Sequence, residues 1–291
     1  MDRSAEIREF LRTRRARITP DQAGLAPHTG ARRVPGLRRE EVAQLAGVSV
    51  DYYIRLERGQ AKGVSTSVLE AVARALHLDE TERAHLFDLT QPTTTRARRK
   101  RLLAPQRVRP ALYQALEALT VPAVVEGRRT DVLAANRLAC ALYTDFEARP
   151  RRERNFARFV FLDEAARTLY ADWEAIAGNC VASLRLYAGR HPDDPQLTDL
   201  VGELSVHSDT FRRMWADHDV RAHTNGTKRF HHPLVGELSL DYVVLAVEGD
   251  PDQTLVVYTP EPASPSAEAL DILASWTGAS TAGAPTRRQG A

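Results

Sequence analysis

Five histidines in one short stretch of the sequence are candidates for metal binding or catalysis. Within 26 residues the chain places His207, His218, His223, His231 and His232, together with Asp209, Asp217 and Asp219. Imidazole and carboxylate groups bind zinc, iron and manganese, but metal sites use tight spacings such as HExxH or CxxC, and neither occurs here. His231 and His232 are adjacent in a predicted strand, so they point to opposite faces. We expect no metal and no cofactor, and we interpret His232 as a structural residue at a strand end.

Motifs of common catalytic sites are also missing. The sequence contains no GxSxG elbow, no GxGxxG after a predicted strand and no GxxxxGK[ST] loop. Cys140 and Cys180 are too few for a disulfide framework, and both lie on apolar helix faces, as reduced core thiols do. We therefore expect that the protein is not an enzyme.

Charge is unevenly distributed along the chain. Residues 1–110 contain 22 Lys and Arg against 13 Asp and Glu, a net charge of +9, whereas the remaining residues have a net charge of −7. Such asymmetry favours a nucleic-acid partner for the basic half, although a solvated basic face would give the same count.

The segment between Arg39 and Gly59 has the spacing of two helices joined by a tight turn. Ala43 is small enough for a close helix approach, Gly47 tolerates the positive φ of the turn, and Ser49 can cap the second helix. Its apolar positions form a shared core: Val42, Ala46, Val48, Tyr53 and Leu56. The pattern predicts a helix-turn-helix.

The pattern AxxAGVSxxYxxRLExG in this segment resembles the Cro/C1-type, or XRE-type, helix-turn-helix family. The resemblance implies binding to double-stranded DNA, with the second helix in the major groove. It also implies that Glu57 forms an ion pair within the domain, with an arginine of the first helix such as Arg12 or Arg14.

The resemblance further implies which residues contact DNA. Val50, Asp51 and Arg55 would contact base edges, and Arg39 and Ser49 would contact phosphates at helix N-termini. Five further residues would contact the DNA backbone, thymine methyl groups or the sugar edge: Arg38, Tyr52, Ile54, Arg58 and Lys62.

A long insert, residues 18–37, precedes this segment. The run RVPGLRREEVAQLAGVSVDYYIRLERG is similar to the MmyB-like subgroup of actinobacterial regulators, and the similarity continues through residues 112–136, 170–173, 211–220 and 232–238. The resemblance covers nearly the whole chain and implies a C-terminal PAS-like domain that binds a small ligand.

The expected fold is all-α followed by α+β. Residues 1–90 are expected to form a five-helix DNA-binding domain, residues 91–110 a basic linker or an additional DNA-contacting arm, and residues 278–291 a disordered tail. Residues 111–277 would form the PAS-like domain, with an antiparallel sheet of about five strands. Strands are predicted at 121–126, 130–134, 229–232, 237–247 and 254–259.

Helices of the second domain follow from apolar periodicity. The strongest apolar stripe predicts one long helix over residues 163–189, and residues 266–276 are predicted to form the last helix. Candidate ligand-contacting residues are Asn136, Phe159, Trp173, Arg185, Tyr187, Phe211, Trp215 and Tyr242. Aromatic stripes also form ordinary cores, so packing is the alternative role for each ring. Trp173 and Tyr242 bring polar groups that a core does not need, and Asn136 and Arg185 could orient a ligand.

The function expected from these observations is sequence-specific transcription regulation by a homodimer on an inverted repeat. A small, partly apolar effector in the second domain would modulate DNA binding. Two alternatives keep the DNA-binding half and make the second domain a ligand-free docking module or a metal-dependent catalyst. A repressor and an activator fit the sequence equally. The chain has no run of 18 apolar residues and no signal-peptide core at its start, so we expect a cytoplasmic protein that does not contact membrane.

Overall fold

The computed structural model describes residues 3–25, 34, 36–61, 63–90, 105–218, 220, 225–250 and 252–282. The chain divides into two compact units. Met1–Ala104 and Val181–Ala222 make up the first, here called the helical unit, and Pro105–Cys180 and His223–Ala291 make up the second, the sheet unit. Val181–Ala222 thus groups with the N-terminal helices by its contacts, and the expected domain over residues 111–277 stays a prediction.

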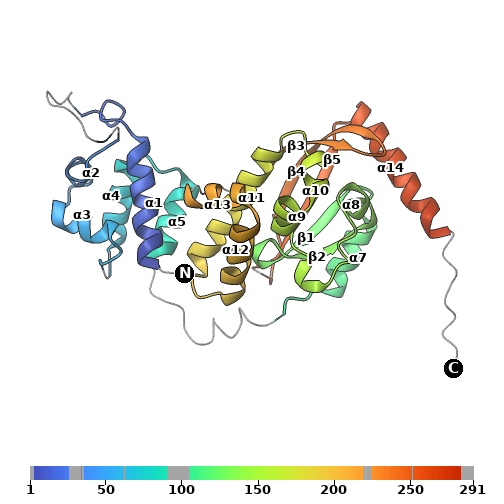
Figure 1. Cartoon of the computed structure of the whole chain (residues 1–291), viewed down its shortest axis with the longest axis horizontal. Helices are drawn as coiled ribbons and strands as arrows, with labels where there is room; N and C mark the ends of the chain where they lie inside the picture. The colour runs from blue at the N-terminus through green and yellow to red at the C-terminus, as the bar shows by residue number, and fades with distance from the viewer. Residues whose placement is uncertain are drawn as a thin grey trace. The chain divides into compact units, whose positions relative to one another are not determined.

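The N-terminal part of the helical unit contains the five helices that the sequence predicts. They are α1 (Arg3–Arg17), α2 (Arg39–Ala46), α3 (Val50–Glu57), α4 (Thr66–Ala75) and α5 (Glu80–Thr90) (Figure 1). Their apolar faces meet in one core, in which Leu11, Val42 and Tyr53 have no exposed surface. Burying side chains of this size stabilises the fold by about 1.5–3 kcal/mol each.

Local signals set the ends of these helices. The Ser49 hydroxyl accepts a hydrogen bond from the Tyr52 backbone N–H at 3.2 Å, which starts α3. Gly47 has a φ of 66°, the left-handed conformation that turns the chain from α2 into α3. Asp79 and Glu82 form a reciprocal capping box before α5, with hydrogen bonds of 2.8 and 3.2 Å.

Three later segments complete the helical unit. These are the C-terminal half of α11 (Trp173–Arg190), α12 (Pro195–His207) and α13 (Asp209–Ala216). The Asp194 carboxylate caps α12, and Arg190 Nε contacts Asp88 Oδ2 of α5 at 3.1 Å. The second half of the sequence therefore contributes structure to the unit that holds α1–α5.

The prediction of a single long helix over residues 163–189 is wrong. The chain instead forms α10 (Glu164–Leu169) and α11, and Tyr170 between them is extended, with φ −94° and ψ 125°. Tyr170 forms a β-bridge with Phe230, and the Ala171 N–H donates to the Arg229 carbonyl at 3.1 Å. An apolar stripe cannot reveal this break, because the competing partner lies on a strand far along the chain.

The sheet unit contains the predicted antiparallel sheet. Its five strands are β1 (Ala123–Glu126), β2 (Val132–Ala135), β3 (Asn225–His232), β4 (Gly236–Ala246) and β5 (Thr254–Pro260). Their order is β2-β1-β5-β4-β3, and every neighbouring pair is antiparallel. Lys228 pairs with Leu240, and Tyr242 pairs with Tyr258. Because side chains alternate along a strand, these positions share one face of the sheet.

Helices and short 3₁₀ turns surround the strands. They are α7 (Pro110–Ala118), α8 (Arg137–Leu142), α9 (Phe156–Leu162), α10, α14 (Pro265–Ala282), η1 (Arg128–Thr130) and η2 (Arg151–Glu153). Helix α7 buries Leu116 against Ala123 and Val125 of β1. Helix α14 runs past its predicted end at residue 276 and into the segment predicted to be a disordered tail.

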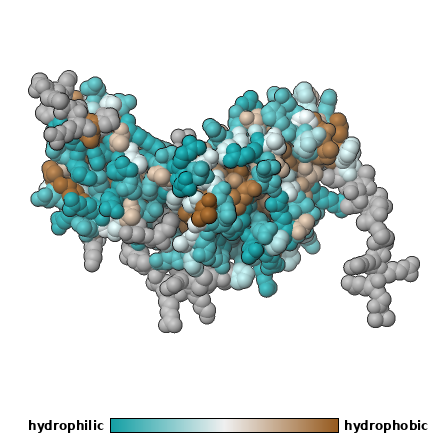
Figure 2. Space-filling view, in the orientation of Figure 1, coloured by the Kyte–Doolittle hydropathy of each residue, from teal (hydrophilic) through white to brown (hydrophobic). Residues whose placement is uncertain are grey.

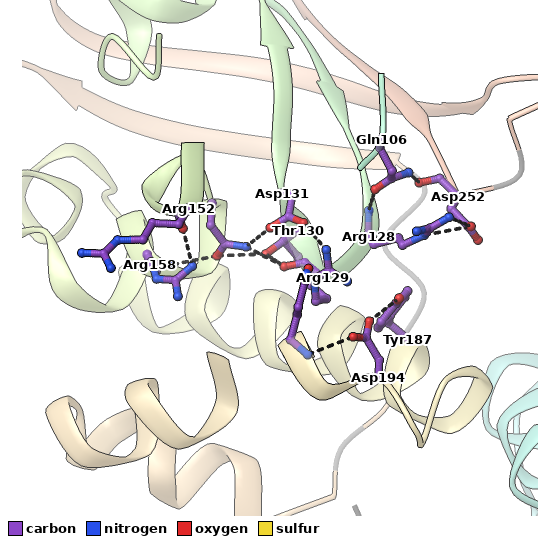
Figure 3. Close-up of polar contacts among 12 residues, drawn as sticks. Gln106, Arg128, Arg129, Thr130, Asp131, Arg152, Arg158, Tyr187, Asp194 and Asp252 are labelled. Atoms are coloured by element: carbon purple, nitrogen blue, oxygen red, sulfur yellow. Dashed lines mark hydrogen bonds and ion pairs between the residues drawn. The ribbon is translucent and has the colours of Figure 1, made fainter. Parts of the chain in front are cut away.

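The end of the predicted linker is held by the sheet unit. Gln106 accepts a hydrogen bond from the Arg128 backbone N–H at 2.8 Å and donates to the Asp252 carbonyl at 3.0 Å (Figure 3). Arg109 forms an ion pair with Asp250 at 2.7 Å. Residues 91–104 of the linker and residues 283–291 of the tail lie outside the described residues. In the described parts of the chain, no helix is long and apolar enough to cross a bilayer.

Candidate functional site

A buried carboxylate fixes α3 in the helical unit. Glu57 is 1% exposed, and its oxygens lie 3.1 Å from Nη2 of Arg15 on α1 and 2.9 Å from Nε of Arg39 on α2. The ion pair implied for Glu57 therefore exists, but its partners are Arg15 and Arg39 rather than Arg12 or Arg14. Arg12 contacts Glu9, and Arg14 contacts Glu82 instead. One carboxylate thus joins the three helices that must keep a fixed geometry.

The outer side of α3 presents polar and apolar groups to solvent. Ser49, Asp51 and Arg55 are exposed, and Val50 keeps 42% of its surface exposed. The Arg55 guanidinium lies 5.8 Å from the centre of the Tyr52 ring, within cation–π range. This exposed side can enter a groove without disturbing the core beneath it.

A cationic residue occupies the covered face of the sheet. The Lys228 ammonium donates to the Tyr258 hydroxyl at 2.9 Å. It also lies 5.2, 4.8 and 5.0 Å from the ring centres of Phe156, Tyr242 and Tyr258. Burial lowers the pKa of Lys228, but Tyr258, Glu126 and Tyr242 outweigh that effect, so its pKa is raised overall. The lysine is therefore charged at neutral pH, inside an aromatic cage.

Two tyrosine hydroxyls near this cage lack normal hydrogen bonds. Tyr143 and Tyr170 are 8% and 2% exposed, and neither buried hydroxyl has a partner at hydrogen-bonding distance and angle. The Tyr143 hydroxyl lies beside that of Tyr258 and the Tyr170 hydroxyl beside that of Tyr143, so these groups affect one another without hydrogen bonds of normal geometry, and burial raises the pKa of both Tyr143 and Tyr170. The Tyr143 ring packs edge-on against Phe156 at 5.8 Å. A buried hydroxyl left unsatisfied costs about 1–3 kcal/mol, which a bound acceptor would recover.

Two further titratable groups belong to the same interior. Burial raises the pKa of Glu126 on β1, while Lys228 opposes the rise. Burial also raises the pKa of the Cys180 thiol, with Glu126 adding to the effect. The thiol of Cys140 has a pKa raised to about 11, mainly by burial. Both thiols are therefore protonated at neutral pH and unreactive.

Comparison with known protein families assigns both halves of the chain. Residues 6–86 match a helix-turn-helix domain, and residues 108–273 match the MmyB-like transcription regulator ligand binding domain. The chain belongs to the MmyB-like transcription regulators. It is a DNA-binding regulator with a ligand-binding C-terminal domain, and this family is not an enzyme family. No curated protein is similar enough in sequence to count as a match.

The DNA-contacting residues predicted for this MmyB-like regulator gather at α2 and α3. Arg38 precedes the first residue of α2, and Arg39 is that first residue, with 48% of its side chain exposed although it also holds Glu57. Ile54 is half-buried, and Arg58 is exposed at the C-terminal end of α3. Lys62 lies outside the described residues.

Four of the predicted ligand-contacting residues belong to the sheet unit. The Asn136 amide is used by the backbone: its oxygen accepts from Ala123 and Ala139, and its nitrogen donates to Val121 at 2.8 Å. Trp173 donates its indole N–H to a carbonyl on α9 at 3.0 Å, and Phe159 is a buried core ring. Tyr242 is one of the three aromatic rings around the Lys228 ammonium.

The other four predicted ligand residues lie in the helical unit. Arg185 contacts Glu6 of α1 at 2.5 Å, donates to the Trp215 carbonyl and stacks 4.1 Å above the Trp215 ring. Phe211 stacks on Trp215 with ring centres 5.6 Å apart. The Tyr187 hydroxyl donates to Asp194 at 2.7 Å (Figure 3). The eight predicted residues are therefore divided between two units.

Sequence reasoning missed the lysine cage. Lys228, Tyr143, Tyr170 and Tyr258 were not predicted as site residues. The available signal was alternation: Lys228 and Phe230 occupy the same face of β3, but the strand was predicted to begin only at Arg229.

His232 has ordinary structural contacts. His232 Nε2 lies 3.0 Å from the Ala141 carbonyl, and its Nδ1 accepts from the Leu234 N–H at 3.3 Å. His223 and Asp219 lie outside the described residues. Across the parts of the chain that the structure describes, no three His, Cys, Asp or Glu side chains gather as metal ligands.

Proposed function

We propose that this regulator binds a specific operator as a homodimer, with the outer side of α3 in the major groove. The observation that supports this is the exposed set of Val50, Asp51 and Arg55 on a helix whose C-terminal end is fixed by the buried Glu57 ion pairs. Helix-turn-helix dimers place two such helices about 34 Å apart, one turn of DNA, so the operator would be an inverted repeat. Such a protein acts where the DNA is, so we also propose a cytoplasmic location.

We propose the Lys228 cage as the place where the C-terminal domain holds its effector. The rings of Phe156, Tyr242 and Tyr258 favour an apolar or aromatic body, because they bury large apolar area. The Lys228 ammonium and the hydroxyls of Tyr143 and Tyr170 supply donors. The effector is therefore a small, partly apolar molecule with a hydrogen-bond acceptor at one end.

Native mass spectrometry of the full chain tests both proposals. A dimer carrying a discrete adduct, lost on denaturation, is the expected result. Lys228→Met should lose the adduct, and Arg229→Met is the matched control, because Arg229 sits on the opposite face of β3 in an exposed ion pair with Asp172. Retention of the same adduct by Lys228→Met would contradict the cage, and a monomer on operator DNA would contradict the dimer.

A ligand-free docking module is the second candidate for the C-terminal domain. Figure 2 shows a mainly hydrophilic visible face with small hydrophobic patches. Large apolar side chains on α14 stay in solvent, with Ile272 51% and Trp276 60% exposed. An adduct-free dimer whose association is lost in Trp276→Ser would favour this role.

A further inference from the structure

The first turns of α3 carry three chemically different groups toward solvent. Val50 presents an apolar branched side chain, Asp51 presents only hydrogen-bond acceptors, and Arg55 presents only donors. DNA base edges in the major groove offer the complements of all three: the thymine methyl group, the cytosine amino group and the paired acceptors of guanine.

The two charges on this helix do not neutralise each other. Asp51 and Arg55 are four residues apart, a spacing at which opposite charges commonly pair on a helix. Among the described side chains, however, neither has an ion-pair partner, and Arg55 lies over the Tyr52 ring instead. Both charged groups therefore keep their hydrogen-bonding capacity for another molecule.

The helix that carries these groups is held at both ends. The buried Glu57, the last residue of α3, joins Arg15 and Arg39, and the Ser49 hydroxyl fixes the first turn. Side chains that project from an anchored helix reach their targets with little conformational cost.

Building on the proposed operator binding, we infer the base composition of each half-site. Arg55 donates two hydrogen bonds to a guanine, Asp51 accepts from a cytosine amino group, and Val50 contacts a thymine methyl group. Tyr52 is a positioning residue that holds the Arg55 guanidinium by stacking. A helix rises 1.5 Å per residue, so Asp51 and Arg55 lie about 6 Å apart along its axis. Since base pairs are stacked about 3.4 Å apart, the guanine and the cytosine are expected within about two base-pair steps.

The test is selection of binding sites from a random double-stranded DNA library by the full chain, at one fixed salt concentration. The wild-type protein is expected to select an inverted repeat with a guanine, a cytosine and a thymine in each half-site. Arg55→Ala should reduce the preference for guanine at one position by about 5- to 150-fold, the range for a bidentate contact, and leave the other positions unchanged. Asp51→Ala should relax only the cytosine.

Substitutions at Arg58 and Tyr52 separate recognition of specific bases from sequence-independent binding to DNA. Arg58→Ala removes an exposed arginine of the same helix region and should weaken binding to all sequences without changing the selected motif. Tyr52→Phe keeps the ring and should keep the guanine preference, whereas Tyr52→Ala should reduce it several-fold while binding to unrelated DNA stays constant.

The outcomes distinguish this inference from the function on which it rests. If the wild-type chain selects no motif, sequence-specific binding itself is wrong. If it selects a motif without the guanine, or if Arg55→Ala keeps the wild-type preference at every position, only the half-site assignment is overturned. Equal preferences in Tyr52→Ala and Tyr52→Phe would overturn the positioning role of Tyr52.

Discussion

Removing Arg185 should strongly destabilise the helical unit. Its guanidinium lies 2.5 Å from a Glu6 oxygen, and the two side chains are only 3% and 18% exposed. Breaking a buried ion pair by deleting one partner costs about 3–5 kcal/mol, because the remaining charge stays buried without compensation. His218 lies 3.5 Å from Glu6 but carries no charge in the wild-type chain at neutral pH, since burial and the nearby arginines, Arg185 first among them, lower its pKa to about 3.

Arg190 offers a matched control on the same helix. Its ion pair with Asp88 joins α11 to α5, just as the Arg185 ion pair joins α11 to α1, but the Arg190 side chain is 54% exposed. Exposed pairs contribute about 0–1 kcal/mol. Arg185→Met should therefore lower the free energy of unfolding by at least about 2 kcal/mol more than Arg190→Met, a difference of about 30-fold in the unfolding equilibrium.

The assay is urea unfolding followed by fluorescence of Trp215, whose ring lies under the Arg185 guanidinium. The other two tryptophans are first replaced, as Trp173→Phe and Trp276→Phe, so that the signal reports the helical unit. Adding Glu6→Gln to Arg185→Met should restore part of the loss, because it removes the orphaned charge. Equal unfolding free energies for Arg185→Met and Arg190→Met would refute the argument.

Three further predictions concern other parts of the chain. Burial and nearby arginines lower the pKa of His85 to about 3, so between pH 6.5 and 3 the His85 imidazole is protonated in the unfolded chain but not in the folded one. The free energy of unfolding, measured by urea titration, should therefore fall from pH 6.5 toward pH 3, and it should fall less steeply in His85→Gln. Tyr170→Phe removes an unsatisfied buried hydroxyl and should raise the melting temperature of the ligand-free chain, whereas Tyr258→Phe, which deprives Lys228 of a partner, should lower it. Glu57→Gln should weaken operator binding measured by fluorescence anisotropy at least tenfold more than the exposed-site change Glu80→Gln, because it loosens the anchor of α3.

The helix-turn-helix could be predicted from the sequence because its signals are local. Ser49, Gly47 and the capping box at Asp79 act within four residues of themselves, and all three behave as expected. The identity of the Glu57 partners was less accessible, because the first helix carries arginines on several faces. Only the packed geometry selects Arg15.

The break between α10 and α11 illustrates a limit of periodicity. Leu169 and Trp173 are four residues apart, so they fit one helical stripe and gave no sign of an interruption. Tyr170 leaves the helix because β3 offers it a backbone partner at Phe230, and its ring is 2% exposed among other aromatic rings. Tertiary contacts overrode the local preference for helix.

Arg185 shows most clearly what the fold adds to a site residue predicted from sequence. A buried arginine in a ligand-binding domain is reasonably interpreted as a ligand contact, because burial of an unpaired charge is costly. Its compensating partner is Glu6, which is 179 residues away in the sequence, so no local pattern could reveal the pair. Lys228 is the converse case: it was overlooked as a strand residue, yet its ammonium is charged within a cage of aromatic rings. The fold supplies partners to both charges: Arg185 contacts Glu6 and a carbonyl, and Lys228 contacts the Tyr258 hydroxyl. What distinguishes Lys228 is its surroundings, because three aromatic rings and two buried tyrosine hydroxyls without a hydrogen bond of normal geometry support its proposed role as a ligand contact.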